Sequence, residues 1–228
     1  MRAVTPRGIL LDIEGTTTPI AFVYDVLFPF ARSRVGEYLQ HADLKALKHE
    51  HDNDLRQGQN PPPWSDKPVE YLQWLIDHDR KSTPLKSLQG EIWFEGFKRG
   101  ELHGEVFQDV PRALRRWRQK DIDVRIFSSG SILAQRLLFS TTSSGDLTEF
   151  LNGYFDTTIG PKKDPASYRQ IANAFGLPAS EILFISDVTQ ELDAARQAGM
   201  QTLLCVRPGN HPQPPHDHPT VTSLDDVP

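Results

Sequence analysis

Short apolar runs alternate with helix-like stretches along most of this 228-residue chain, and each run ends at polar residues, glycine or proline. Uninterrupted apolar runs of this length, bounded by turn-forming residues, are typical of buried strands in a parallel sheet. Strands that alternate with helices predict an α/β fold with a doubly wound, right-handed parallel sheet. The predicted strands are residues 9–11, 124–127, 154–159, 182–185 and 202–206.

Helices are predicted between these strands, where apolar residues recur at three- and four-residue spacing. Two of them end at Gly176 and Gly199, because glycine suits the left-handed conformation that closes many helices. Beyond Pro208 the chain is rich in proline and histidine, and we expect irregular structure there. The helices predicted in this part of the chain are residues 111–119, 132–139, 166–175 and a last one that ends at 198.

A long insertion follows the first strand, and it carries helical patterns alone. We therefore predict two domains: a discontinuous core of residues 1–19 and 106–228, and a helical domain of residues 20–105. Pro29 predicts a kink or an early stop in the first inserted helix. The helices expected in the insertion are residues 22–31, a solvated helix at 43–57, and two amphipathic helices at 69–76 and 85–97.

Composition narrows the classes of partner and compartment. The chain has 25 Lys and Arg against 30 Asp and Glu, a formal net charge of −5, with both signs interspersed. A nucleic-acid-binding surface needs a basic stripe and a membrane helix needs roughly 18–20 apolar residues in a row, so we expect neither partner. Cys205 is the single cysteine, which excludes an internal disulfide, and the N-terminus has no apolar signal segment. We expect a cytoplasmic protein.

Polar side chains stand at or just beyond the ends of four predicted strands. In a doubly wound sheet these ends converge on one crevice, even when the sequence spreads them widely. The alternation of a strand predicts that Asp12 and Glu14 point the same way, into one site. The candidate site residues are Asp12, Glu14, Ser128, Ser129, Lys162 and Asp187.

These residue types suit phosphoryl transfer. An aspartate can act as a nucleophile and form an acyl-phosphate, which divides one difficult hydrolysis into two displacements. Carboxylates together with a backbone carbonyl are the hard oxygen ligands that Mg²⁺ prefers. A lysine offsets the repulsion between the carboxylate and a phosphate, and hydroxyls with backbone N–H groups at a strand-to-helix turn complete an anion site.

This order of elements resembles the haloacid dehalogenase superfamily of aspartyl-phosphate hydrolases. Within it, the chain is similar, from about residue 8 to residue 210, to the enolase-phosphatase family of methionine salvage. Glu14 is the sharpest mark, since most superfamily phosphatases have a second Asp there and this family has Glu. The insertion has the size of that family's helical cap. The stretches that carry the likeness are Leu11–Pro19, Ser128–Gln135, Phe155–Gly160, Ser167 with Tyr168, Ser186–Glu191 and Val206–Asn210.

The resemblance implies a monomeric, Mg²⁺-dependent enzyme with one metal ion per subunit and two activities. Its implied substrate is a phosphorylated diketone, 2,3-diketo-5-methylthiopentyl-1-phosphate. The substrate would be enolised and then dephosphorylated to the acireductone 1,2-dihydroxy-3-keto-5-methylthiopentene. On this reading, 20–105 is the cap and the remainder is the core.

The resemblance also implies roles for single residues. Asp12 would be the nucleophile and a metal ligand, and Asp187 a second ligand. Glu14 would reach the metal through its backbone carbonyl, with its side chain available for proton transfer. Two serines and a lysine would hold the phosphoryl group: Ser128, Ser129 and Lys162.

Several assignments have alternatives in the sequence. One of the two serines is open to a purely helix-capping role. Lys162 is favoured over Lys163 by its spacing from Gly160. Glu191 suits either the outer shell of the metal site or a solvated helix face. The base for enolisation is Glu14, a cap residue or metal-bound water. The histidines beyond Pro208 suggest a metal site only weakly; they are His211, His216 and His218.

Other functions compete on the same scaffold. A different capped sugar-phosphate phosphatase would share the metal and the nucleophile, whereas a dehalogenase would not need the metal. The superfamily has four sequence marks: an Asp-x-acid strand end, a Ser/Thr strand end, a Lys and a late acidic strand end. An inactive binding module would be expected to lose one of them, and all four are present. One departure from the enolase-phosphatase pattern lies at residues 140–144, where a Gly-His pair is expected and Ser-Thr-Thr-Ser-Ser stands instead.

Overall fold

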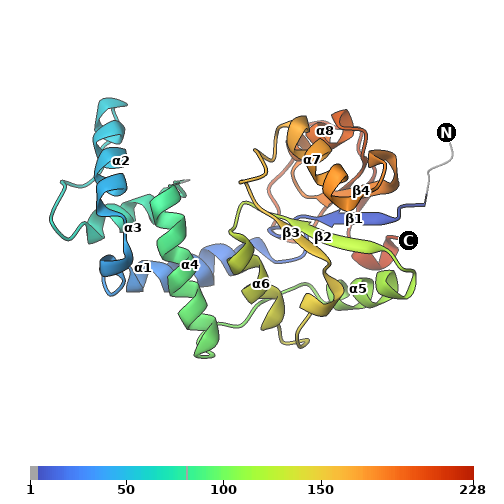
Figure 1. The fold of residues 1–228 in the computed structure, drawn as a ribbon, viewed down its shortest axis with the longest axis horizontal. Coiled ribbons are helices and arrows are strands. Elements are labelled where there is room, and N and C mark those ends of the chain that lie inside the picture. The colour runs from blue at the N-terminus through green and yellow to red at the C-terminus, as the bar shows by residue number, and fades with distance from the viewer. Residues whose placement is uncertain (1–4, 81) are drawn as a thin grey trace. The chain divides into compact units, whose positions relative to one another are not determined.

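A computed structural model describes residues 5–80 and 82–228 (Figure 1). The chain divides into two compact units. One, the core unit, contains the residues up to Phe22 together with His103–Pro228, and the other, the helical unit, is Val23–Leu102. Residues 1–4, which the predicted core range includes, lie outside the described part. Within that part, no helix has the length and apolar character needed to cross a membrane.

The core unit is built on a parallel six-stranded sheet in the order β3-β2-β1-β4-β5-β6. The strand order reverses between β1 and β4, which pair with each other at the centre of the sheet. Open α/β sheets bind their ligands at such a reversal, beyond the carboxyl ends of the strands. The strands are β1 (Gly8–Leu11), β2 (Asp123–Phe127), β3 (Gly153–Phe155), β4 (Ile182–Ser186), β5 (Gln201–Cys205) and β6 (Thr220–Val221).

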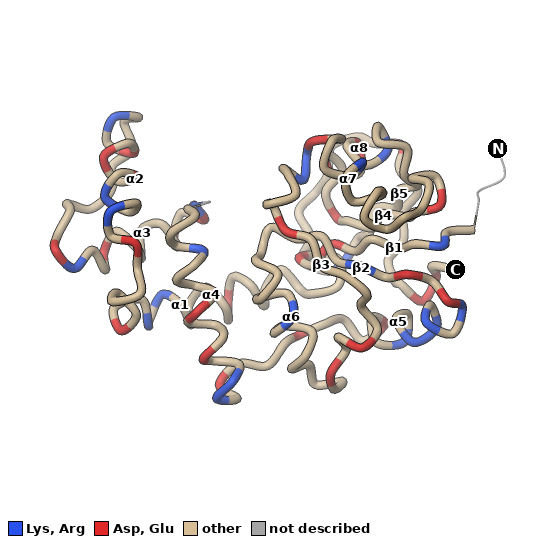
Figure 2. Tube along the Cα trace, viewed as in Figure 1, with Lys and Arg blue, Asp and Glu red and all other residues tan. Residues whose placement is uncertain are grey.

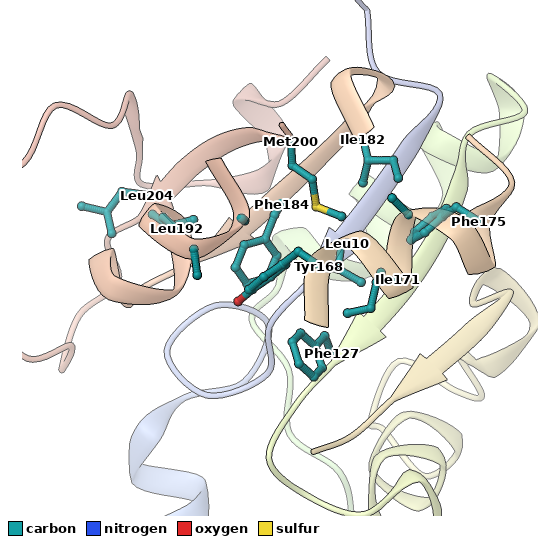
Figure 3. Packing of buried hydrophobic residues seen from close by; sticks show 13 residues of the cluster. Leu10, Phe127, Tyr168, Ile171, Phe175, Ile182, Phe184, Leu192, Met200 and Leu204 are labelled. Carbon is teal, nitrogen blue, oxygen red and sulfur yellow. The ribbon is translucent and has the colours of Figure 1, made fainter. Parts of the chain in front are cut away.

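Helices cover both faces of this sheet, as the doubly wound prediction requires (Figure 1). Figure 3 shows the core between the sheet and two of them, where the Tyr168 ring packs between Phe127 and Phe184. One face carries α5 (Asp109–Gln119) and α6 (Ile132–Ser140), and the other carries α7 (Pro165–Phe175) and α8 (Thr189–Gln197).

The third strand is shorter than the sequence predicts. β3 ends at Phe155, and the predicted strand ran on to Ile159. Asp156 explains the early end, because its Oδ1 accepts hydrogen bonds from the Thr158 backbone N–H at 3.0 Å and from the Thr158 hydroxyl at 2.6 Å. A side chain that bonds to the backbone two residues ahead favours a turn over a strand.

The segment beyond Pro208 is more ordered than the predicted irregular structure. Its β6 strand adds to the edge of the sheet beside β5. The Trp117 indole donates a hydrogen bond to the Pro228 carbonyl at 3.0 Å, and Arg112 pairs with Asp225. In Figure 2 the basic residues of α5 lie close to the acidic residues near the C-terminus. The prediction failed because these elements are too short to show periodicity.

The helical unit begins with a π-helical turn, Phe22–Leu27, that crosses the boundary between the units. Pro29 does not stop the helix: it stands in the first turn of α1, where its missing N–H costs least. The α-helices of this unit are α1 (Phe28–Arg34), α2 (Leu44–Arg56), α3 (Val69–Asp77) and α4 (Thr83–Lys98).

Helix α2 is not the fully solvated helix that its polar sequence predicts. Leu47, His51 and Asp54 are buried. The Asp54 carboxylate accepts a hydrogen bond from the Tyr71 hydroxyl at 2.8 Å and pairs with the Arg80 guanidinium. Buried charges need such partners, so the polar face of α2 is partly an internal network of the helical unit.

Candidate active site

Asp12 lies directly beyond β1, at the reversal point of the sheet, and it is buried. Its backbone N–H donates to the Ile185 carbonyl at 3.0 Å and so extends the pairing of β1 with β4 by one bond. Its Oδ1 accepts hydrogen bonds from the Ile13 backbone N–H and from Lys162 Nζ, both at 2.7 Å. The Ser186 hydroxyl lies 3.2 Å from Oδ2. The Asp12 carboxylate is therefore held in one orientation.

Lys162 reaches Asp12 because the start of α7 fixes the backbone around it. The Tyr168 hydroxyl donates to the Lys162 carbonyl at 2.7 Å, and the Ser167 hydroxyl donates to the preceding carbonyl at 2.8 Å. Gly160 is required for this packing, because a Cβ there would lie 2.3 Å from Ser167 Oγ. Lys163 is exposed, so the lysine favoured by its spacing from Gly160 is the one beside Asp12.

Glu191 belongs to the same cluster and does not lie on a solvated helix face. It is buried, and its Oε2 lies 2.6 Å from Lys162 Nζ and 3.3 Å from the Ser186 hydroxyl. The Lys162 ammonium is thus shared between two carboxylates, Asp12 and Glu191. A buried charge of each sign within hydrogen-bond distance stabilises the other.

The balance of charge in the cluster is negative. Burial raises the pKa of Asp187 to about 7, and repulsion from Asp12 and Glu191 adds to the effect. Burial also raises the pKa of Glu191, against the opposing attraction of Lys162. Burial lowers the pKa of Lys162, but its two carboxylate partners outweigh this and hold the pKa above its usual value. Three carboxylates around one ammonium leave an excess of negative charge that a cation would neutralise.

Gly15 lets the loop after β1 pass close to Asp187. Its φ of 67° is in the left-handed region, and a Cβ would lie 2.3 Å from Asp187 Oδ2. β1 ends at Leu11, so Asp12 and Glu14 lie beyond the strand. Strand alternation therefore does not determine whether their side chains point the same way, as the sequence analysis had assumed. Glu14 is half-buried and forms a backbone bridge with Thr18, which closes the loop.

The two serines follow β2, and neither caps the next helix. The cap of α6 is Ser131, whose hydroxyl accepts from the Ala134 N–H at 3.3 Å. Ser128 is buried, and its Oγ accepts from the Gly130 N–H at 3.2 Å. The Ser128 hydroxyl keeps its proton for donation to another group. Ser129 is half-buried beside it.

Two residues of the segment after β5 hold the loop after β1, and sequence reasoning gave neither of them a role. Arg207 donates to the Thr16 carbonyl from Nε at 3.2 Å and from Nη2 at 3.1 Å, and it pairs with the buried Asp109 at 2.7 Å. Asn210 Nδ2 donates to the Gly15 carbonyl at 3.0 Å. Two signals in the sequence pointed to them: their position just beyond a strand end, and their place in the stretch Val206–Asn210, which resembles the family.

The donor set suits a hard divalent cation. Among the described residues, no three His, Cys, Asp or Glu side chains are arranged to hold a metal, and this includes the histidines beyond Pro208. The predicted set needs only two carboxylates, Asp12 and Asp187, with the Glu14 carbonyl as a third oxygen. Mg²⁺ commonly binds through one or two carboxylates and keeps several waters. The negative excess and the raised pKa of Asp187 agree with this fit.

Comparisons with known proteins identify the family. The family model for haloacid dehalogenase-like hydrolases matches residues 6–199. An enolase-phosphatase E1 of Synechococcus elongatus is 47% identical, over 98% of this chain and 98% of that protein.

The chain belongs to the enolase-phosphatase E1 family.

The similarity extends to other members of the enolase-phosphatase E1 family and to solved structures. An enolase-phosphatase E1 of Pseudomonas aeruginosa is 46% identical over 98% of this chain and 99% of that protein. The UTR4 protein of Saccharomyces cerevisiae has a TM-score of 0.77 and 32% identity, covering 98% of this chain and all of that one. CbbY from Rhodobacter sphaeroides, at 14% identity and a TM-score of 0.65, is similar in fold alone.

These matches confirm the family and the fold class inferred from the sequence. The protein is a haloacid dehalogenase-like hydrolase of the enolase-phosphatase E1 family of methionine salvage, with a parallel α/β core. The similarity to enolase-phosphatases spans nearly the whole chain, which favours that family over a general sugar-phosphate phosphatase.

Proposed function

We propose that this protein enolises 2,3-diketo-5-methylthiopentyl-1-phosphate and then hydrolyses the phosphate ester to give the acireductone. The observation that carries the proposal is the contact between Asp12 and Lys162 at the reversal point of the sheet. A carboxylate fixed beside an ammonium is prepared for attack on a phosphoryl group, since the cation offsets the repulsion between the two anions.

Enolisation comes first in the proposed sequence. The carbon that bears the phosphate lies next to a carbonyl, so its protons are acidic. Loss of one proton gives an enolate with a carbon–carbon double bond, and the enolate oxygen, that of the neighbouring carbonyl, then takes up a proton to become the enol. The Glu14 side chain is our candidate for the group that accepts this proton. It stands two residues from Asp12, in the loop after β1.

Phosphoryl transfer follows through Asp12. A carboxylate oxygen of Asp12 attacks phosphorus, the ester P–O bond breaks, and the departing oxygen takes a proton to become the hydroxyl of the product. Water then attacks the aspartyl-phosphate, which releases phosphate and restores the Asp12 carboxylate. Lys162 and the hydroxyls of Ser128 and Ser129 hold the phosphoryl oxygens in both displacements.

Mg²⁺ is part of this proposal, with Asp12, Asp187 and the Glu14 carbonyl as its ligands. When bound, a single Mg²⁺ ion would neutralise the carboxylates and stabilise charge on the phosphoryl oxygens. The chain's own contribution is to orient Asp12 through Ile13 and Lys162, so that the nucleophile needs no rearrangement before attack.

The remaining parts of the proposal concern the whole molecule. We propose that residues 20–105 act as a cap that selects the substrate, and that the protein works as a cytoplasmic monomer. The free, buried Cys205 supports the compartment, because reduced cysteines are usual in the cytoplasm.

Replacing Glu14 by Ala tests the enolase half of the function. We expect enol formation, followed by ultraviolet absorbance, to fall by roughly 10²–10⁴-fold, the usual contribution of a general base. The variant keeps the Glu14 carbonyl, so release of phosphate from a simple phosphomonoester is expected to change much less. If this variant forms the enol at the wild-type rate, the base that accepts the proton is a group other than Glu14.

The raised pKa of Asp187 predicts how stability depends on pH. The folded pKa of about 7 lies above the usual value near 3.9, so the folded state holds this proton more tightly than the unfolded state. The stabilisation from this group is complete below about pH 4 and is lost as the pH rises to about 7. The melting temperature of the metal-free protein should therefore fall between pH 5 and pH 8, and Mg²⁺ should restore it at pH 8.

Asp187→Asn should weaken that pH dependence, as measured by thermal melts in EDTA. The matched control is Asp121→Asn, because Asp121 is exposed and has a φ of 54° that Asn tolerates. An equally steep fall in the Asp187→Asn protein would assign the pH dependence to other groups, with Glu191 the first candidate.

A further inference from the structure

Asn210 has an orientation fixed by two hydrogen bonds. Its Nδ2 donates to the Gly15 carbonyl at 3.0 Å and to the Cys205 carbonyl at 3.2 Å. Carbonyl oxygens only accept hydrogen bonds, so the NH₂ end of the amide has to face them. The Oδ1 end must therefore point to the other side.

The Oδ1 atom of Asn210 is buried and has no hydrogen-bond partner within the described ranges, 5–80 and 82–228. Its surroundings are defined by Gly15. A Cβ on Gly15 would lie 2.9 Å from Asn210 Oδ1 and 2.3 Å from Asp187 Oδ2. An amide oxygen and a carboxylate oxygen thus both lie against Gly15. Leaving a buried acceptor without a donor costs free energy, so a donor bound beside Asp187 would stabilise Asn210 Oδ1.

A hydrated cation would supply that donor. Mg²⁺ bound by a small number of carboxylates keeps several waters, whose hydrogens point away from the ion. A water molecule bound to an ion beside Asp187 is a hydrogen-bond donor, and Asn210 Oδ1 is an acceptor without a partner among the described residues. Groups that orient metal ligands in this manner commonly change metal affinity or activity by about 10–100-fold when they are removed.

We propose that Asn210 is a positioning residue for the magnesium site. Its amide nitrogen holds the Gly15 carbonyl, and hence the loop that carries the Glu14 carbonyl. Its amide oxygen accepts a hydrogen bond from a water molecule of the ion that Asp187 binds. The inference rests on the magnesium site of the proposed function and adds a residue to it.

The rest of the segment after β5 supports this role. Arg207, three residues before Asn210, holds the next carbonyl of the same loop, that of Thr16, with two donors. The Asn210 backbone N–H donates to the Arg207 carbonyl at 3.1 Å, which fixes the backbone turn between the two residues. Successive carbonyls of the loop after β1 are thus fixed from one short segment.

The experiment is titration of the protein with MgCl₂ by isothermal calorimetry, without substrate, in wild type, Asn210→Ala and Asn210→Leu. Leucine has the same number and branching of side-chain heavy atoms as asparagine, so it removes the amide without leaving a cavity. We expect both variants to bind Mg²⁺ about tenfold or more weakly than wild type. Their kcat for phosphate release should fall, and KM for the phosphorylated substrate should change little.

Gln135 provides a matched control, because it makes the same pattern of bonds at another strand end. Its Nε2 donates to the carbonyls of Gly130 and Phe155, both at 2.8 Å, and its Oε1 is also buried without a described partner. We expect Gln135→Leu to bind Mg²⁺ with the wild-type affinity. An equal loss in both Leu variants would indicate a general effect on the fold and would overturn the inference.

Two further outcomes separate the inference from the proposed function. If the wild type does not bind Mg²⁺, the magnesium site of the proposed function is wrong. If it does, and both Asn210 variants bind as well as wild type while melting at lower temperature, Asn210 is only structural. A crystal structure of the wild type with MgCl₂ provides an independent test of the proposal. A metal-bound water within about 3.2 Å of Asn210 Oδ1 is expected, and its absence would contradict the proposal.

Discussion

Replacing Asp12 by Asn is expected to abolish phosphate release, lowering kcat by at least about 10⁴-fold. The amide has nearly the same shape as the carboxylate, so the hydrogen bond from the Ile13 N–H can be kept. It lacks the negative charge that attacks phosphorus, and no acyl-phosphate can form. Folding should survive, because the Lys162 ammonium keeps Glu191 as a partner and the change removes one negative charge from a cluster with an excess of them.

Phosphate release in a single turnover is the direct measurement. Asp66→Asn, in an exposed loop of the helical unit, is the control and should behave as wild type. Incubation with beryllium fluoride and Mg²⁺, which mimics the aspartyl-phosphate, should stabilise the wild type against heat and leave Asp12→Asn unchanged. Substantial turnover in freshly prepared Asp12→Asn protein would show that another group is the nucleophile.

Replacing Lys162 by Met is expected to have the second largest effect, and it should act on both rate and stability. Loss of a positioned cation of this kind typically lowers kcat by about 10²–10³-fold. Removing one partner of a buried ion pair destabilises a protein by about 3–5 kcal/mol. The loss of stability should be larger at pH 8 than at pH 5, because at pH 5 the carboxyl groups of Asp187 and Glu191 are largely protonated.

The neighbouring lysine provides the control for this substitution. Lys163→Met alters an exposed side chain, so both its kcat and its unfolding free energy should stay close to wild type. Denaturant unfolding at the two pH values measures the stability of both variants. Equal effects of the two substitutions would contradict the assignment of the lysine role to Lys162.

The features that the sequence predicted well are those that depend on local pattern. Short runs rich in apolar residues predicted β1, β2, β4 and β5. The pattern is clearest in β1 and β4, which are buried throughout, because a strand covered on both faces needs apolar side chains at successive positions. The candidate residues at the strand ends followed from the same pattern. The spacing from Gly160 favoured Lys162 over Lys163, and Lys162 is the lysine that contacts Asp12. This spacing is informative because local packing against Ser167 requires the glycine.

The features that the sequence did not predict depend on partners far along the chain. Glu191 lies on the first turn of α8, and its own sequence context is the same whether the carboxylate faces solvent or Lys162. Asn210 and Arg207 act on carbonyls about 190 residues away, and carbonyl positions leave no mark in a side-chain pattern. The β6 strand has two residues, too few for any periodicity to appear.

The central position of β1 has a consequence for how the protein is made. β1 is made well before its neighbours in the sheet, because both strands that pair with it come more than a hundred residues later in the chain. Asp12 meets Lys162 after 150 further residues, and Gly15 meets Asn210 after 195. A nascent chain therefore carries its nucleophile long before the groups that orient it. Catalytic competence should arise only once the chain has been made as far as Asn210, so shorter chains would be inert toward the cell's phosphate esters.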